Sequence, residues 1–119
     1  GVKSGKIGTE SSVDDVLKSR NGGSYSYLKD HPSVGPGKNF TQIQKRKIVE
    51  ENMKVNKGNV LSDQSGTQCV KPVKHTKGVT PPSNEAHIDH IVPRSQGGTN
   101  SYSNAQVLTR EENLRKGTN

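Results

Sequence analysis

The sequence predicts a small α+β domain, and three observations support this class. Residues 40–55 have the apolar spacing of one strong helix, whereas residues 85–117 have the pattern of strand, polar loop, strand and short helix. Hydrophobic residues make up 25% of the 119 residues and aromatic residues 3%, so any core must be small. No apolar run is long enough to span a membrane.

The first 38 residues are predicted to form a loop-rich extension with one short helix. Residues 12–15 fit a capping box that opens this helix, and residues 21–23, Asn-Gly-Gly, end it. The loop that follows contains Tyr25 and Tyr27. Their rings could stack on nucleic-acid bases, but we expect them to anchor the loop to the core.

Residues 39–84 are predicted to form a basic helix, a hairpin and an extended arm, which pack with residues 85–119 as one compact domain from residue 38 onward. Asn39 or Thr41 caps the helix, and Lys57 with Gly58 stops it. The stripe expected to face the core comprises Phe40, Ile43, the stem of Lys47, Ile48 or Val49, and Met53.

The hairpin is expected to pair residues 59–61 with 67–70 around a polar turn at 62–66. Cys69 is the single cysteine, so an intramolecular disulfide is excluded. We expect a small buried side chain there, with a reactive thiol as the alternative. Residues 71–84 contain three prolines and several cations, and we interpret them as an extended basic arm.

The C-terminal strand–loop–strand–helix pattern has clear start and stop signals. Pro93 closes the first strand, and Gly97 and Gly98 are expected to take positive φ in the loop. Residues 105–108 alternate as a second strand. Thr109 and Glu112 form a capping box for the helix. Gly117 is the expected stop.

Four polar residues fall in order within this pattern. Asp89 and His90 end the first strand, Asn104 opens the second, and Asn113 lies one turn into the helix. This resembles the HNH nuclease family, and it implies a small ββα-metal (HNH) nuclease core with an N-terminal helical and loop-rich extension. The matching segments are residues 89–93, 97–100, 104–108 and 112–117, with asparagine at the third signature position, a common family variant.

The resemblance assigns roles that suit phosphodiester hydrolysis, which needs an activated water and a counter to phosphate charge. It implies that His90 is the general base and that Asn104 orients its ring. Asp89 and Asn113 would hold one divalent ion, Mg²⁺ first, with Zn²⁺, Mn²⁺ or Ni²⁺ as alternatives. His87 is a possible further ligand or substrate contact, or simply a packed histidine. Candidates for phosphate contacts, or for a solvated charged surface, are Arg94, Arg110, Arg115, Lys116, Lys71 and Lys74.

Positive charge is concentrated outside this pattern. Residues 1–84 contain 14 Lys and Arg against 7 Asp and Glu, whereas residues 85–119 contain 4 of each. The whole net charge of +7 therefore belongs to the first part of the chain. We interpret it as a grip on the phosphate backbone that is largely independent of sequence and weakens with salt, with solubility as the alternative.

A wider resemblance, to C-terminal toxin domains of bacterial polymorphic toxins of the contact-dependent inhibition and Rhs types, rests on five features. These are the helix around Lys45 and the pairs at residues 62–63, 71–72, 89–90 and 103–104. It implies secretion or delivery as part of a larger protein and action in the cytoplasm of a target bacterium. It also implies a cognate immunity protein, acidic to complement the +7 charge.

The function predicted from the sequence is a metal-dependent, largely nonspecific DNA endonuclease, a toxin module. Three alternatives stay open. One is an RNase of the same fold, and another is a catalytically idle nucleic-acid-binding module. The third is a homing or phage-type nuclease. The chain begins with Gly1, and we expect it to be a fragment or released domain of a larger protein.

Overall fold

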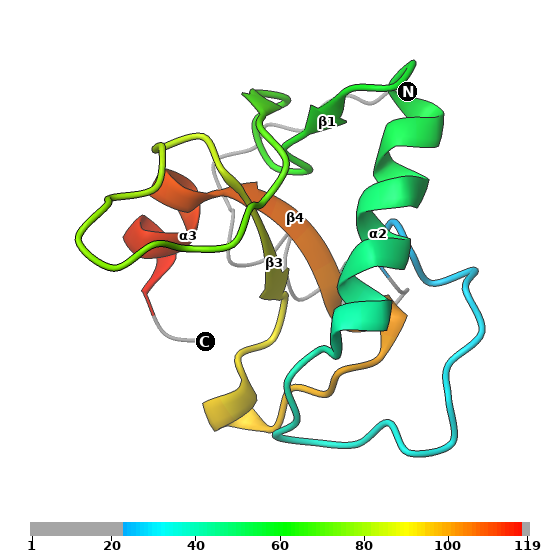
Figure 1. Ribbon diagram of the computed structural model, residues 1–119. Helices are drawn as coiled ribbons and strands as arrows, with labels where there is room; N and C mark the ends of the chain where they lie inside the picture. The colour runs from blue at the N-terminus through cyan, green and yellow to red at the C-terminus, as the bar shows by residue number, and fades with distance from the viewer. Residues whose placement is uncertain (1–22, 118–119) are drawn as a thin grey trace.

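The computed structural model describes residues 23–117 as a small α+β fold (Figure 1). The predicted class is therefore confirmed, while the short helix expected at residues 12–20 lies outside the described part. No helix in the described part is long and apolar enough to cross a membrane. The elements are α2 (Gln42–Val55), β1 (Val60–Leu61), β2 (Gln68–Cys69), β3 (Ala86–His90), η1 (Arg94–Gln96), η2 (Tyr102–Asn104), β4 (Ala105–Thr109) and α3 (Arg110–Lys116).

Strands β3 and β4 form the central antiparallel pair. Their register runs from Ala86 opposite Thr109 to His90 opposite Ala105, and every residue of β4 is buried. Two 3₁₀ turns, η1 and η2, lie in the connection between them. Helix α3 follows β4 directly and lies against the pair (Figure 1). The order strand, strand, helix matches the predicted core.

Capping chemistry sets the ends of α3 as predicted. The Thr109 hydroxyl accepts from the Glu112 backbone N–H, and the Glu112 carboxylate accepts from the Thr109 N–H. Gly117 ends the helix with φ of 86°. Because a helix of seven residues has little stability of its own, these caps and its packing determine where Asn113 lies.

Helix α2 is capped by Thr41 through a second capping box, also as predicted. Its buried side differs from the predicted stripe, since Ile43 is 73% exposed. The inward residues are Gln44, Ile48, Glu51 and Asn52. Polar groups tolerate burial when they find partners, and Gln44 Nε2 donates to the Asn100 carbonyl at 2.7 Å. Packing of this face therefore depends on hydrogen bonds that apolar periodicity does not reveal.

The small hairpin β1–β2, with its turn (residues 60–69), is called the brace here. The predicted hairpin is confirmed, although each strand has only two residues. Asn52 of α2 binds the brace, because the Asn52 side-chain amide donates to Leu61 O and accepts from Leu61 N, each at 2.9 Å. Asp63 joins the brace to β4, since its carboxylate accepts from Val107 N at 2.7 Å. These hydrogen bonds hold the two short strands of the brace in place.

The predicted burial of Cys69 and Tyr25 is confirmed. Burial, together with the carboxylates of Glu112 and Asp63, raises the pKa of the Cys69 thiol to about 11. This favours the inert thiol over a reactive one. The Tyr25 hydroxyl donates to Asp63 at 2.8 Å, so this ring anchors the N-terminal loop. Tyr27 is mostly exposed, but its hydroxyl donates to Glu51.

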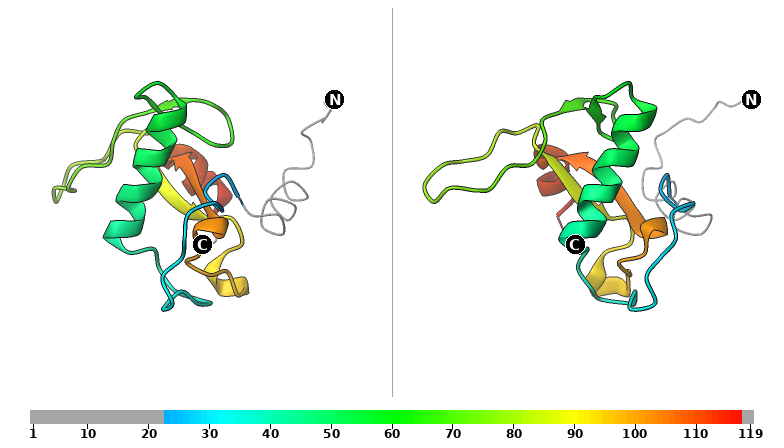
Figure 2. Two further views of the ribbon diagram at one scale, coloured as in Figure 1. Left: turned by 90° about the vertical axis from the view of Figure 1, so that its right-hand side faces the viewer. Right: turned by 45° about the vertical axis from the view of Figure 1, so that its right-hand side comes forward.

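Residues 71–84 contain no helix or strand and extend away from the body as an arm (Figure 2). Residues 71–80 are all exposed, as expected for a basic, proline-containing segment. The arm is attached at its base, where Val70 bridges to Glu85. Farther out, His75 Nε2 lies 3.0 Å from Glu85 Oε1.

Candidate active site

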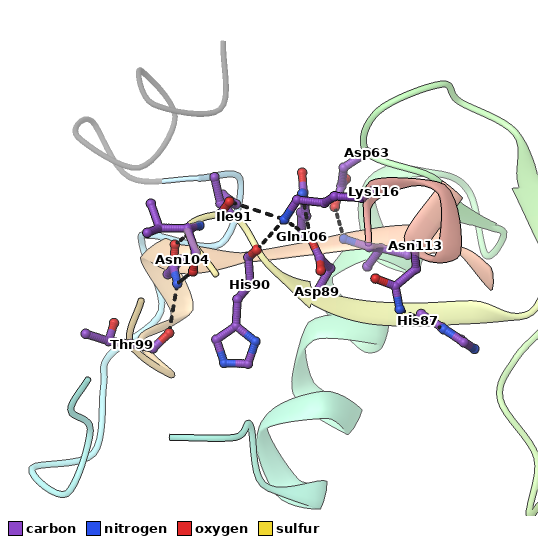
Figure 3. A network of polar contacts seen from close by, with 12 residues as sticks. Asp63, His87, Asp89, His90, Ile91, Thr99, Asn104, Gln106, Asn113 and Lys116 are labelled. Carbon is purple, nitrogen blue, oxygen red and sulfur yellow. Dashed lines mark hydrogen bonds and ion pairs between the residues drawn. The ribbon is translucent and has the colours of Figure 1, made fainter. Parts of the chain in front are cut away.

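Side chains of β3 divide between two sides of the strand, because neighbouring residues point in opposite directions. His87 and Asp89 contact residues of α3. The His90 ring instead packs on Phe40, with ring centroids 4.4 Å apart. Figure 3 shows the His90 ring and the Lys116 side chain on opposite sides of β3. Asp89 and His90, although adjacent in the sequence, therefore lie in two different environments.

Asp89 is fully buried and forms an ion pair with Lys116, at 2.7 Å between Oδ2 and Nζ. Gln106 Nε2 donates to the same oxygen at 2.9 Å. Lys116 also donates to the carbonyls of His90 at 2.6 Å and Ile91 at 3.3 Å. All three hydrogens of this ammonium have acceptors, so the structure places Lys116 against Asp89 and not at an open phosphate position.

The His90 ring is held by an element far away in the sequence. Its side chain is nearly buried, and Nε2 lies 2.8 Å from the Lys38 carbonyl oxygen. A carbonyl can only accept, so Nε2 must carry the hydrogen. In the neutral ring Nδ1 then carries the lone pair, which is the form that a general base requires.

Asn104 was expected to orient the His90 ring, but its amide holds the backbone of the following loop. Its Oδ1 accepts from Val92 N at 2.9 Å, and its Nδ2 donates to Val92 O at 3.1 Å and Thr99 O at 2.9 Å. Both amide hydrogens are therefore used on the loop (Figure 3). The Asn104 amide thus forms a backbone clamp just after His90.

Asn113 lies where the sequence placed it, facing the hairpin. Its Nδ2 is 3.0 Å from Nδ1 of His87, and His87 Nε2 is 3.0 Å from Glu85 Oε1. An amide N–H donates, so Nδ1 accepts and Nε2 donates to the carboxylate. His87 is thus joined to Asn113, as the prediction of an additional ligand or contact requires, but its role stays a prediction.

Glu85 and His75 were missed by the sequence reasoning. Burial alone would raise the pKa of the Glu85 carboxyl, but hydrogen bonds from His75, His87 and the Val73 backbone outweigh it and lower the pKa. Glu85 therefore stays charged while buried. Glu85 lies two residues before His87, and this spacing in an extended segment predicts that both side chains face the same side. No local sequence pattern predicts that His75, which lies in the arm, contacts Glu85.

A cleft of about 860 Å³ opens beside this cluster, between α2, the arm, β3 and α3. His87 and Asn113 line it, together with Lys71 and Lys74 from the predicted phosphate contacts. The remaining candidates lie outside its lining, namely Arg94, Arg110, Arg115 and Lys116, as do Asp89 and His90. Arg115 instead pairs with Glu111 on α3, at 3.2 Å.

A divalent ion fits the donor atoms only in part. Within residues 23–117, no three His, Cys, Asp or Glu side chains are arranged to hold a metal ion. Yet Lys116 already places a positive charge among three oxygens, and Asp89 Oδ1 is buried without a hydrogen-bond partner in the described region. Mg²⁺ often uses one or two protein carboxylates and leaves other positions to water and phosphate. Asp89 and Asn113 are suitable ligand types for such an ion.

Residues 67–119 match the family model described as HNH endonuclease. The match covers β3, β4, α3 and the loop that Asn104 clamps. Comparison with curated proteins and with solved structures gives no match. The family match and the strand–strand–helix arrangement together support placing this C-terminal part of the chain in the HNH endonuclease family, a family of nucleases.

Proposed function

We propose that this protein is a metal-dependent, largely sequence-nonspecific DNA endonuclease. The observation that carries the proposal is the HNH match over the hairpin and helix that contain Asp89, His90 and Asn113. The positive charge of residues 1–84 supports a polyanionic substrate and a grip on its backbone. Mg²⁺ is the proposed ion, because the available ligands are oxygens.

In this proposal His90 takes the proton from the attacking water. The Lys38 carbonyl holds hydrogen on Nε2 and so leaves Nδ1 as the basic nitrogen. The tilted contact with Phe40 restricts rotation of the ring. Asn104 fixes the loop that leaves β3, and this keeps the backbone of His90 in place.

Asp89 and Asn113 would hold the divalent ion. When bound, the ion would offset charge on the phosphate and assist departure of the leaving oxygen. Without it, the Lys116 ammonium neutralises Asp89. This explains how a fully buried carboxylate is retained in the fold.

We further propose that the nuclease is a toxin module, delivered as part of a larger protein into the cytoplasm of a neighbouring bacterium. The wider resemblance of residues 45–104 to polymorphic toxins supports this. A cognate immunity protein with an acidic surface would complement the +7 charge. Co-expression with the neighbouring gene product would test this part, since only a true immunity protein abolishes both toxicity and DNA cutting.

The test is cleavage of supercoiled plasmid with Mg²⁺, Mn²⁺, Zn²⁺, Ni²⁺ or chelator. We expect metal-dependent nicking that falls by at least about a hundredfold in His90→Ala, the range for loss of a general base. His31→Ala is the matched control, because the His31 side chain is exposed and its ring hydrogen-bonds only to Ser33 among the described residues. Cleavage of RNA but not DNA would favour the RNase alternative. Cleavage of neither would leave the idle binding module.

A further inference from the structure

We propose that the cleft beside β3 is the groove for the phosphodiester backbone of duplex DNA, gripped by two basic walls. The proposal rests on the function proposed above and deepens it by assigning the substrate a surface. One wall is α2, which contributes Lys45 and Arg46. The other is the arm, which contributes Lys71 and Lys74. In Figure 1 β3 lies between these two segments.

No carboxylate within residues 23–117 pairs with the four wall cations, and all four line the same cleft. On the same helix, Lys47 and Lys54 both pair with Glu51, at 3.4 and 2.9 Å. The described lining of the cleft contains one carboxylate, Glu85, and two histidines already bind it. The cleft therefore has a local excess of positive charge that an anion would complement.

The chemistry of the lining favours the DNA backbone over the bases. Among the described residues that line the cleft, none is aromatic except the two histidines bound to Glu85, so a stacking platform for bases is missing. Flexible lysine and arginine side chains contact phosphates without reading sequence. This agrees with a nuclease that cuts without strong sequence preference.

The cleft also leads to the proposed chemistry. His87 and Asn113 line it between the two walls, and Asn113 is one of the proposed ion ligands. A strand bound by both walls would therefore pass the middle of α3, where Asn113 lies. The outer arginines, Arg94 and Arg110, do not line this path.

The experiment is equilibrium binding of the full chain to a short fluorescein-labelled DNA duplex, by anisotropy, in chelator and over a range of salt. The arm variant is Lys71→Gln/Lys74→Gln, and the helix variant is Lys45→Gln/Arg46→Gln. The control is Lys29→Gln/Lys57→Gln, which removes the same charge from exposed positions outside the cleft. Circular dichroism establishes that each variant is folded.

We expect both cleft variants to bind more weakly, with a slope of log affinity against log salt that is shallower by about 2, one for each lost phosphate contact. The control should keep the wild-type slope and bind within about twofold of wild type, because net charge acts weakly at a distance once salt screens it.

Equal weakening in the cleft variants and the control would overturn the proposal, since net charge alone would then explain binding. Weaker DNA binding in only one of the two cleft variants would overturn the proposal of a groove with two basic walls. If duplex RNA bound more tightly than duplex DNA, and the cleft variants weakened that binding in the same way, RNA would replace DNA as the proposed partner. Because binding in chelator involves no cleavage, this result is independent of whether the nuclease proposal succeeds.

Discussion

The two strand pairs in the described part of the chain use the same polar residue types in different ways. At the brace, Asp63 and the α2 residue Asn52 bond to backbone groups and to the Tyr25 hydroxyl. In the β3–β4 pair, Asp89 holds an ammonium and Asn113 contacts a histidine. An aspartate and an asparagine thus stabilise one hairpin and form a candidate site in the other.

What separates the two regions is the partner. A backbone N–H is a permanent donor whose position follows from the fold, so the brace carboxylate is committed to structure. A lysine ammonium is a mobile cation, and another cation can take its place on the same oxygens. The partner of a buried carboxylate, more than its burial, therefore distinguishes a structural aspartate from a candidate ligand.

The largest expected effect tests this distinction with two matched substitutions. Asp89→Asn should lower plasmid cleavage by at least about a hundredfold per folded molecule, because the proposed ion ligand loses its charge. It should also cost up to about 3 kcal/mol, since Lys116 loses its counter-charge. Asp63→Asn should cost about 1–3 kcal/mol. Tyr25 and Val107 N both donate to Oδ2, so the amide oxygen must take that position, and the amide nitrogen then replaces the Oδ1 acceptor that faces the Asn52 amide donor at 3.5 Å.

Urea unfolding gives the two stabilities, and cleavage is measured well below both melting temperatures. Asp63→Asn should keep activity within a few-fold of wild type. The distinction breaks if both variants lose cleavage equally, or if Asp89→Asn remains active.

A second prediction concerns two adjacent glycines in the loop after His90. Gly97 takes a φ of 89° with open space around it, as expected from the sequence. Gly98 does not have positive φ. A Cβ there would lie 1.8 Å from the Val92 carbonyl oxygen. Gly98→Ala should therefore cost about 3 kcal/mol, at the upper end for overpacking, whereas Gly97→Ala costs about 1 kcal/mol of backbone strain.

Thermal unfolding of the two variants measures this order. Because Val92 is also the residue that Asn104 clamps, Gly98→Ala should reduce cleavage as well. An equal, small cost in both variants would show that the loop relaxes and that the site tolerates its movement.

Local signals predicted most of the fold, and they failed where distant parts of the chain meet. Each capping box spans only four residues, so the sequence alone could predict Thr41 and Thr109 as helix N-caps. Ile43 was placed wrongly, because the inward face of α2 is satisfied by polar bonds to Asn100 and Leu61. Apolar periodicity cannot report such bonds.

The candidate site shows the same limit. The order Asp89, His90, Asn104, Asn113 indicated the hairpin and helix correctly. The Lys38 carbonyl, 52 residues before His90, supplies the ring contact that the sequence reasoning gave to Asn104. Likewise Lys116 was grouped with surface cations, although its ammonium lies on Asp89. Residue order identified the motif, whereas tertiary packing determined each partner.

The smallest expected effect is the response of helix α2 to acid. Hydrogen bonds from Tyr27 and then Lys54 lower the pKa of Glu51 from 4.5 to about 2. A carboxyl with a lowered folded pKa adds stability above its unfolded pKa, and this is lost as pH falls from about 4.5 to about 2. Glu51→Gln should therefore lose less stability than wild type across this window, by urea unfolding at each pH. Glu50→Gln, an exposed neighbour on α2, should keep the wild-type dependence. Equal acid sensitivity in all three proteins would place the acid response in other carboxyls with lowered pKa values, with Glu85 and Glu112 as the next to test.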